Sequence, residues 1–166
     1  MSIDNLSTKW TINYLGLAKH IAEWSKDPST KCGAIAIGKH MQILSVGFNG
    51  FPRKIEDTAE RLNDRPTKYS LMVHAEMNCI YNATLNGISL DDATMFVYGL
   101  PVCSECAKGI IQSGIKKIVA SYPPIISDKW REMGQLTSQM FEECGIEYFI
   151  FFNILFLIYK ERSSFF

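Results

Sequence analysis

The stretch from Thr94 to Ala120, TMFVYGLPVCSECAKGIIQSGIKKIVA, contains a complete strand–helix–strand pattern. Thr94–Tyr98 is a short apolar run of the kind that forms a buried strand. Cys103–Ser113 has the length and composition of a helix that ends at Gly114, and Lys117–Ala120 returns to an apolar strand. Because crossovers of this kind join parallel strands of one sheet, the stretch predicts a parallel strand pair covered by a helix.

The segments that precede this stretch add a helix, a β-hairpin and a second helix. Apolar residues at steps of three and four predict the first helix, and Asp27-Pro28 is expected to end it. Two short apolar runs, Cys32–Gly38 and Gln42–Gly47, predict the hairpin. Residues 74–85 suit a helix that ends at Asn86-Gly87. The apolar face of the first helix comprises Trp10, Tyr14, Leu17, Ile21 and Trp24.

Two further elements follow and complete the fold prediction. Trp130–Cys144 predicts a helix that ends at Gly145, and Ile146–Phe152 predicts a final strand. The complete order predicts an α/β fold, a three-layer α/β/α sandwich with a mixed five-stranded sheet. Neither an internal repeat nor a linker interrupts the pattern, so we expect a single domain over residues 1–152.

Composition and charge restrict the class of partner. The chain of 166 residues is 47% hydrophobic and 20% charged, as expected of a folded soluble domain. Lys plus Arg and Asp plus Glu number 17 each, so no overall positive field favours nucleic acid, and we expect a small-molecule substrate. Five cysteines, an odd number, and an N-terminus without a secretory signal predict a cytoplasmic protein.

The C-terminal segment is strongly apolar. Residues 148–159 read YFIFFNILFLIY, in which Asn153 is the one clearly polar residue. A membrane-spanning helix needs roughly 20 such residues, so we predict no membrane partner. Residues 153–166 are interpreted as an apolar tail of unknown role, packed on the domain or in an oligomer contact. A short interfacial anchor is the alternative.

Residues 48–68 contain Asn49-Gly50, two prolines and many charged residues. We predict a long irregular loop close to the functional site, because such loops in compact domains are usually functional. Five cations of this segment are candidates for binding a phosphate, and a solvated charged loop is the alternative for each. They are Arg53, Lys54, Arg61, Arg65 and Lys68.

Two motifs, His74-Ala75-Glu76 and Pro101-Val-Cys103-Ser-Glu-Cys106, carry the chemistry, and 24 residues separate them. Alone, a histidine near a helix start is usually structural, and a Cys-x-x-Cys can be a redox pair or half of a structural zinc site. Together they closely match the His-x-Glu and Pro-Cys-x-x-Cys signature of zinc deaminases. We therefore predict that His74, Cys103 and Cys106 bind zinc.

This ligand set would leave one position of the metal open. Three protein ligands leave the fourth position of a tetrahedral zinc to water, which is typical of a catalytic site. Glu76 is then interpreted as the proton shuttle and not as a ligand. His74 and Glu76 do not share a helix flank, so we expect the metal beyond the helix ends. The alternative is a structural zinc site with a fourth ligand from Cys79, Cys32 or Cys144.

At these positions the chain resembles the cytidine and deoxycytidylate deaminase superfamily, and within it the deoxycytidylate (dCMP) deaminases, including those of phages. The likeness runs from about residue 27 to residue 151. The resemblance implies a cytidine deaminase-like fold and zinc-dependent hydrolysis of dCMP to dUMP and ammonia, which supplies the precursor of dTMP. It is carried by the segments DPSTKCGA (27–34), GFNGFP (47–52), TKY (67–69), HAEMN (74–78), CSECAK (103–108) and IQSGI (111–115).

The resemblance also implies ligands and assembly. It assigns Asn49 and Ala75 to substrate binding, although Asn49-Gly50 is also a common turn dipeptide. Family members often form hexamers that dCTP activates and dTTP restrains, which implies a homo-oligomer, these effectors, and Mg²⁺ bound with an effector. Phe48 stands where the family usually has tyrosine, which removes a hydroxyl that could bind an effector. Val102 stands where the family usually has proline before the first cysteine.

Two alternatives to dCMP deamination follow from the same residues. The number of phosphates on the substrate cannot be read from the sequence, so a deaminase of dCTP, or of both nucleotides, is the first. The second is a zinc-stabilised interaction module without catalysis. Glu76 beside a three-ligand set argues against this module, because a protein without chemistry needs neither the acid nor an open metal position.

Overall fold

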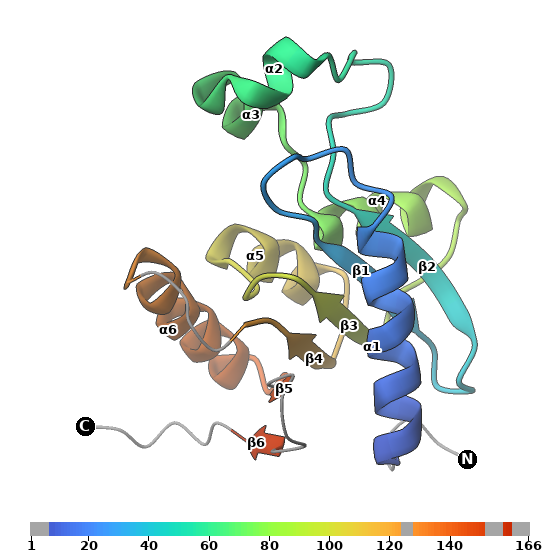
Figure 1. The fold of residues 1–166 in the computed structure, drawn as a ribbon. Coiled ribbons are helices and arrows are strands. Elements are labelled where there is room, and N and C mark those ends of the chain that lie inside the picture. Colours follow the sequence, from blue (N-terminus) through green and yellow to red (C-terminus); the bar gives the residue numbers. More distant parts are fainter. Residues whose placement is uncertain (1–6, 124–127, 152–157, 161–166) are drawn as a thin grey trace.

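A single mixed sheet forms the centre of the computed structural model, which describes residues 7–123, 128–151 and 158–160 (Figure 1). The strands of these residues follow the order β2-β1-β3-β4-β5-β6. The strands are β1 Gly33–Ile37, β2 Ile43–Phe48, β3 Thr94–Tyr98, β4 Lys117–Ser121, β5 Glu147–Phe151 and β6 Ile158–Lys160. The helices are α1 Thr8–Ala22, α2 Ala59–Asn63, α3 Arg65–Leu71, α4 Ala75–Leu85, α5 Ser104–Gln112 and α6 Asp128–Glu143.

Strand directions confirm the predicted mixed sheet. β1 pairs antiparallel with β2 and β3, whereas β3, β4 and β5 run parallel to one another. β1 to β5 are the five predicted strands. β6 adds a short antiparallel strand beside β5, which the interpretation of residues 153–166 as a tail did not include. Residues 152–157 and 161–166, most of that tail, lie outside the described residues.

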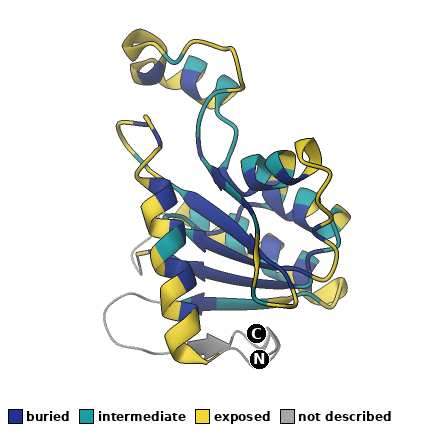
Figure 2. Ribbon diagram, turned by 90° about the vertical axis from the view of Figure 1, so that its right-hand side faces the viewer, coloured by how far each residue is buried: buried dark blue, intermediate teal, exposed yellow. Residues whose placement is uncertain are grey.

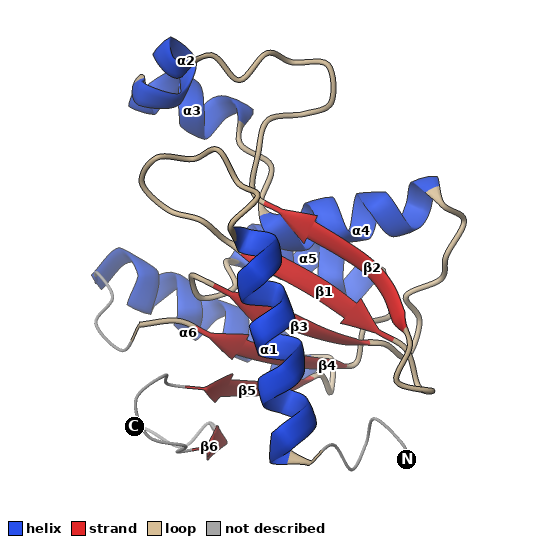
Figure 3. Ribbon diagram, turned by 45° about the vertical axis from the view of Figure 1, so that its right-hand side comes forward, coloured by secondary structure: helices blue, strands red, loops and turns tan. Residues whose placement is uncertain are grey.

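Helices cover both faces of the sheet, as the three-layer prediction requires (Figure 3). α1 lies on one face, where it packs against Ile35, Ile37 and Phe96. α4, α5 and α6 lie on the other face, which presents the intervening residues such as Ala34 and Ala36. Successive side chains of a strand point to opposite faces, so one sheet supports two separate cores. Figure 2 shows the resulting band of buried strands between more exposed helices.

Close packing of α4 on β2 depends on Gly47. A Cβ atom at Gly47 would lie 2.2 Å from the backbone nitrogen of Cys79 and 2.4 Å from the carbonyl oxygen of Ala75. Any side chain there would push α4 away from the sheet. Glycine at this position therefore fixes the first turns of α4, the helix that His74 immediately precedes.

The predicted helix ends are confirmed at Gly87, Gly114 and Gly145. Their φ angles are 65°, 78° and 69°, the left-handed conformation that commonly ends a helix and that glycine adopts without strain. The helix of the strand–helix–strand stretch therefore ends at the predicted residue, Gly114.

The predicted apolar face of α1 is only partly correct. Tyr14 and Ile21 are buried, but Trp10 is 38% exposed and Trp24, which follows the helix, is 53% exposed. The helix instead buries smaller residues between them, such as Ala18, which allow it to lie close to the sheet. It also ends at Ala22, before Asp27-Pro28. The periodic pattern predicted the helix correctly, but it did not predict which side chains of the helix pack against the sheet.

Residues 48–68 are not a continuous irregular loop. The second half of this segment forms α2 and the start of α3, each with a local N-cap. The Thr58 hydroxyl accepts a hydrogen bond from the Arg61 backbone, and the Asp64 carboxylate accepts one from the Thr67 backbone. Such caps stabilise even short helices. The two helices project from the end of the sheet, apart from the main layers (Figures 1 and 3).

Within the part of the chain that the structure describes, no helix has the length and apolar character needed to cross a membrane.

Candidate metal centre

Both predicted motifs lie where the chain enters a helix. His74 is the N-cap of α4 and Cys103 is the N-cap of α5, each with extended backbone angles. Cys106 follows in the first turn of α5, and its backbone nitrogen lies 3.5 Å from the Cys103 sulfur, which accepts its hydrogen bond. N-terminal turns have free N–H groups and a positive dipole end, which stabilise thiolates. The three donor residues thus lie at the N-terminal ends of α4 and α5.

The three predicted ligands converge. The Nδ1 atom of His74 lies 3.4 Å from the Cys103 sulfur and 3.3 Å from the Cys106 sulfur, and all three ligand atoms lie within 4.8 Å of one another. Zinc bonds of ordinary length in a tetrahedral arrangement separate sulfur and nitrogen ligands by about 3.6 Å. The donor set and spacing therefore fit zinc.

A fourth protein ligand is absent from this group. Among the described residues, no further His, Cys, Asp or Glu ligand atom belongs to the cluster. Cys79 is fully buried, and its sulfur does not belong to the cluster. Cys32 and Cys144 are also outside the cluster. The described residues thus form a group of three donors, which none of Cys32, Cys79 and Cys144 joins.

Hydrogen bonds among the three candidate ligands shift the pKa values of their side chains. The hydrogen bond from Cys106 and a further one with His74 lower the pKa of the Cys103 thiol to about 4, although burial opposes this. The hydrogen bond with Cys103 raises the pKa of His74. A separate hydrogen bond with Cys103, together with burial, raises the pKa of Cys106. The lowered pKa of Cys103 favours its thiolate, which is the form of cysteine that binds metals.

Glu76 lies in the first turn of α4, beside the ligands but outside their cluster. Its side chain is almost completely enclosed, with the residue 5% exposed. Burial raises the pKa of its carboxyl, and the charge of His74 opposes this only in part. A carboxyl group with a raised pKa beside a metal centre is suited to accept and release a proton.

A pocket of about 650 Å³ extends from the metal centre toward α2 and α3, a volume typical of small-molecule sites. His74, Ala75 and Glu76 line its inner end, and residues of α2 and α3 line its outer end. Asn49 also borders the pocket, so both residues predicted to contact substrate lie at its wall.

The Asn49 side chain holds two neighbouring backbone segments together. Its Oδ1 accepts a hydrogen bond of 2.7 Å from the Cys32 nitrogen, and its Nδ2 donates one of 2.9 Å to the Thr30 carbonyl. The chain bends at Asn49, and the following Gly50 forms an isolated antiparallel bridge with Val73. Asn49 is 6% exposed and forms part of the pocket wall.

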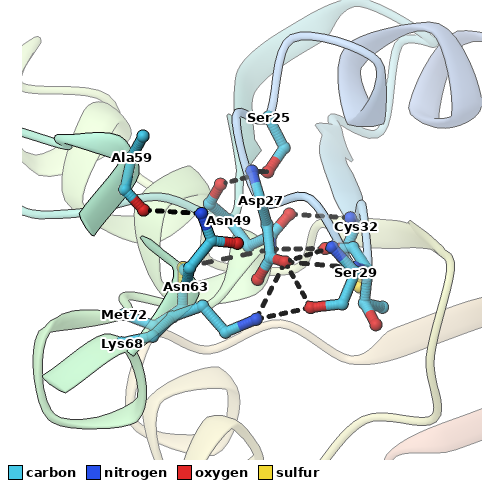
Figure 4. A network of polar contacts seen from close by, with 10 residues as sticks. Ser25, Asp27, Ser29, Cys32, Asn49, Ala59, Asn63, Lys68 and Met72 are labelled. Carbon is cyan, nitrogen blue, oxygen red and sulfur yellow. Dashed lines mark hydrogen bonds and ion pairs between the residues drawn. The ribbon is translucent and has the colours of Figure 1, made fainter. Parts of the chain in front are cut away.

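A buried polar network centred on Asp27 was not predicted (Figure 4). One oxygen of Asp27 accepts hydrogen bonds from the Ser29 nitrogen at 2.8 Å, the Thr30 nitrogen at 3.1 Å and the Lys68 ammonium at 3.1 Å. Burial would raise the pKa of Asp27, but these hydrogen bonds outweigh it and lower the pKa. The Asp-Pro-Ser-Thr sequence was a usable signal, since Asp commonly bonds to the backbone two residues later.

The structure separates the five candidate cations. Arg53 hydrogen-bonds Asn82, and Arg61 donates to the Glu56 carbonyl at 3.0 Å. Lys54, like these two arginines, does not line the pocket. Two of the five, Arg65 and Lys68, do line it.

Both departures from the family pattern are accommodated. Phe48 packs edge-on against Trp24, with ring centroids 6.2 Å apart, and its carbonyl accepts a hydrogen bond of 2.8 Å from Asn78. Val102 is fully buried, and its carbonyl accepts a hydrogen bond from Thr137 at 3.0 Å. The entry into α5 is therefore anchored without proline.

Comparison with known proteins decides the family. Residues 8–122 match the model of the cytidine and deoxycytidylate deaminase zinc-binding region. The chain belongs to the cytidine and deoxycytidylate deaminase family. This match and the three-donor geometry of the centre support zinc as the metal of this deaminase.

Relatives of this deaminase occur in bacteria, animals and phages. It is 38% identical over 143 residues to an uncharacterized deaminase of Aliivibrio fischeri, covering 84% of this chain and 92% of that protein. It is 34% identical over 149 residues to mouse deoxycytidylate deaminase, covering 84% and 78%. It is 55% identical over 145 residues to the deoxycytidylate deaminase of phage T4, covering 63% and 74%.

Solved structures support the fold of this deaminase. The crystal structure of dCMP deaminase from cyanophage S-TIM5 in complex with dCMP and dUMP superposes with a TM-score of 0.71. The two chains are 22% identical, and the match covers 89% of this chain and all of the other. The cytidine deaminase-like fold expected from the resemblance is confirmed.

Proposed function

We propose that this protein is a zinc-dependent enzyme that hydrolyses dCMP to dUMP and ammonia and so supplies the precursor of dTMP. One observation carries the proposal. The His74 Nδ1 atom and the sulfurs of Cys103 and Cys106 converge at the inner end of a pocket, with Glu76 enclosed beside them. Several relatives bear the name deoxycytidylate deaminase, and the cyanophage structure contains dCMP and dUMP.

His74, Cys103 and Cys106 would hold the metal as three protein ligands. Zinc bound in this way supplies Lewis-acid activation of water for attack on the pyrimidine ring. The thiolate character of Cys103 supports this role, because a coordinating cysteine must be deprotonated.

Glu76 would move the protons of the reaction. Its carboxylate would accept a proton from the attacking water and deliver it to the ring nitrogen beside C4. It would then take the remaining proton from the new C4 hydroxyl and deliver it to the departing amine, which leaves as ammonia while C4 becomes a carbonyl. The enclosed position of Glu76 supports this assignment, because burial raises its pKa and allows the carboxyl to hold the proton between transfers. The balanced reaction converts an aminated pyrimidine and water to the keto base and ammonia.

Asn49 and Ala75 would position the substrate. Ala75 is fully buried at the start of α4 and borders the pocket between the metal ligands and Glu76. Asn49 uses one N–H and one lone pair on the backbone of residues 30 and 32. Its Nδ2 atom also lies 3.9 Å from the Met72 sulfur, a weak acceptor that a sugar hydroxyl or a base edge would replace.

Substrate choice is tested by ammonia release from deoxycytidine, dCMP, dCTP and CMP, with purified zinc-loaded protein. We expect dCMP to be the best substrate, and we expect Glu76→Gln to lower kcat by about 10²- to 10⁴-fold while zinc content stays unchanged. A preference for dCTP would support the alternative substrate. No turnover of any compound by the wild type would contradict the enzyme proposal and favour a zinc-stabilised module.

Three further properties remain predictions, the first two from the resemblance and the third from the cysteine content. They are assembly into a homo-hexamer, response to dCTP and dTTP together with Mg²⁺, and a cytoplasmic location. Activity measured with added dCTP and dTTP tests the second, with Phe48→Tyr as the variant that restores the usual hydroxyl of the family.

A further inference from the structure

The inner end of the pocket lies at the metal centre and would hold the pyrimidine base. The residues of the outer end have no role in the proposed reaction. His74, Ala75 and Glu76 line the inner end, whereas Arg65, Lys68 and neighbouring residues of α2 and α3 line the outer end. If the pyrimidine reacts at the metal centre, the remainder of a nucleotide extends toward this outer end. A phosphate monoester carries a charge of nearly −2 near pH 7 and needs cationic donors there.

Lys68 is one cation of the outer end, but an acid already neutralises its charge. The residue is 8% exposed, and its ammonium lies 3.1 Å from the Asp27 carboxylate. It also hydrogen-bonds the Ser29 hydroxyl. The hydrogen bonds to Asp27 lower the pKa of that carboxyl, so the acid remains charged beside Lys68. The pair therefore contributes almost no net positive charge to the pocket.

Arg65 is the other cation, and its charge is uncompensated. Within the ranges 7–123, 128–151 and 158–160, no carboxylate forms an ion pair with Arg65. Its guanidinium carbon lies 5.2 Å from the centroid of the Tyr69 ring, which also borders the pocket. Stacking on an aromatic ring restricts the guanidinium plane while leaving its N–H groups free at the edge.

We infer that Arg65 binds the phosphate of the substrate and makes the enzyme selective for a nucleotide over a nucleoside. Its planar group can donate two parallel hydrogen bonds to phosphate oxygens, which adds orientation as well as charge. Lys68 acts differently: its pair with Asp27 joins α3 to the segment of residues 27–32, so it is a positioning residue. This inference rests on the proposed function, because it names the part of the substrate that the outer end recognises.

The test compares dCMP with deoxycytidine in Arg65→Gln and in a matched control, Arg61→Gln. Arg61 lies on the adjacent α2 and donates to the Glu56 carbonyl without lining the pocket. We expect Arg65→Gln to lower kcat/KM for dCMP roughly 10- to 100-fold, mainly through KM, because it removes charge-assisted hydrogen bonds. Deoxycytidine turnover should remain within about twofold of wild type, and Arg61→Gln should resemble wild type for both substrates.

Arg65→Lys separates charge from geometry. Lysine keeps the charge but not the planar fork, so we expect only partial recovery of the dCMP preference. An unchanged ratio of dCMP to deoxycytidine turnover in Arg65→Gln would overturn the inference, as would an equal loss for both substrates.

Binding measurements keep this test independent of turnover. Calorimetric titration of zinc-loaded protein with dUMP and deoxyuridine should show weaker dUMP binding in Arg65→Gln and unchanged deoxyuridine binding. If the wild type proves inactive on every substrate, this comparison still decides the role of Arg65. Equal dUMP affinity in wild type and Arg65→Gln would refute it even if dCMP deamination is established.

Discussion

The two ends of the pocket are built in contrasting ways. At the inner end, α4 and α5 lie on the sheet, and their N-termini carry His74 and Cys103. At the outer end, α2 and α3 pack mainly on each other and project from the sheet (Figure 1). Polar contacts link this segment to the domain, including the Lys68–Asp27 pair and the Gly50–Val73 bridge beside it. The proposed chemistry thus lies on a packed core, and the proposed phosphate recognition on a segment that projects from it.

This contrast has a physical reason. Metal ligands need atomic positions that vary little, and a packed core with close contacts such as that at Gly47 provides them. A binding segment must admit and release a ligand, and segments with few buried apolar contacts open most easily. Each of the following substitutions removes contacts at one part of the pocket and leaves the contacts elsewhere unchanged.

The largest effect is expected from breaking the inner end with Cys106→Ser. This change removes one of the three zinc ligands, and the lost affinity for zinc should lower turnover by roughly 1,000-fold or more. Zinc content, measured by mass spectrometry after dialysis, should fall in parallel. Full zinc occupancy and full activity in this variant would contradict the proposed ligand set.

Cys79→Ala is the matched control for that variant. Cys79 is also buried near the centre but lies outside the ligand cluster. Removing its small side chain should cost about 1 kcal/mol of unfolding free energy, with unchanged zinc content. Zinc loss here would instead indicate that Cys79 is a fourth ligand.

An intermediate effect is expected from Asp27→Asn, which breaks the outer end. The change leaves the Lys68 charge buried without a partner, and we expect a loss of about 2–4 kcal/mol in unfolding free energy at pH 7. Lys68→Arg, which preserves the charge, is expected to retain more of the stability. An unchanged stability at pH 7 would show that the pair does not hold α3 in place.

The same variant has a defined pH dependence. The folded state lowers the pKa of Asp27, so its carboxylate stabilises the fold above the unfolded value of about 3.9. This contribution is lost as the pH falls from that value through the lower folded pKa. The stability difference between wild type and Asp27→Asn, measured by urea unfolding, should therefore shrink below about pH 4. A difference that grows on acidification would contradict this sign.

The smallest effect is expected from Asn49→Ala, which loosens the wall between the two ends. The change leaves the Cys32 N–H and the Thr30 carbonyl without their side-chain partner, at a cost of about 1–2 kcal/mol. We expect a severalfold increase in KM for dCMP, because this wall borders the pocket. An Asn49→Asp variant keeps the acceptor for Cys32 but places a buried carboxylate oxygen against the Thr30 carbonyl, so it should lose at least as much stability. Unchanged stability in Asn49→Ala would show that these two hydrogen bonds contribute little.

Sequence reasoning succeeded where local chemistry dominates. The helix ends at Gly87 and Gly114 were predicted because a left-handed residue ends a helix, whatever packs around it. The spacing of His74 and the Cys103–Cys106 pair likewise identified three donor residues that the fold brings together, because few sites other than a metal require those donors together.

Sequence reasoning failed where distant contacts decide. Trp10 and Trp24 fit the helical period, yet α1 buries smaller residues because it approaches the sheet closely. The caps Thr58 and Asp64 were visible in the sequence, but the prolines and charges around them favoured a loop.

The sequence alone thus determined five strands and four helices in their order, the three candidate zinc ligands and the presence of Glu76 beside them, because each depends on residue type and short spacing. Only the tertiary structure decided which cations face the pocket. Lys68 and Arg65 are three residues apart and chemically similar, but Asp27, 41 residues before Lys68, neutralises one and leaves the other. A charge acquires its function from its neighbours in space, and those neighbours are set by the fold.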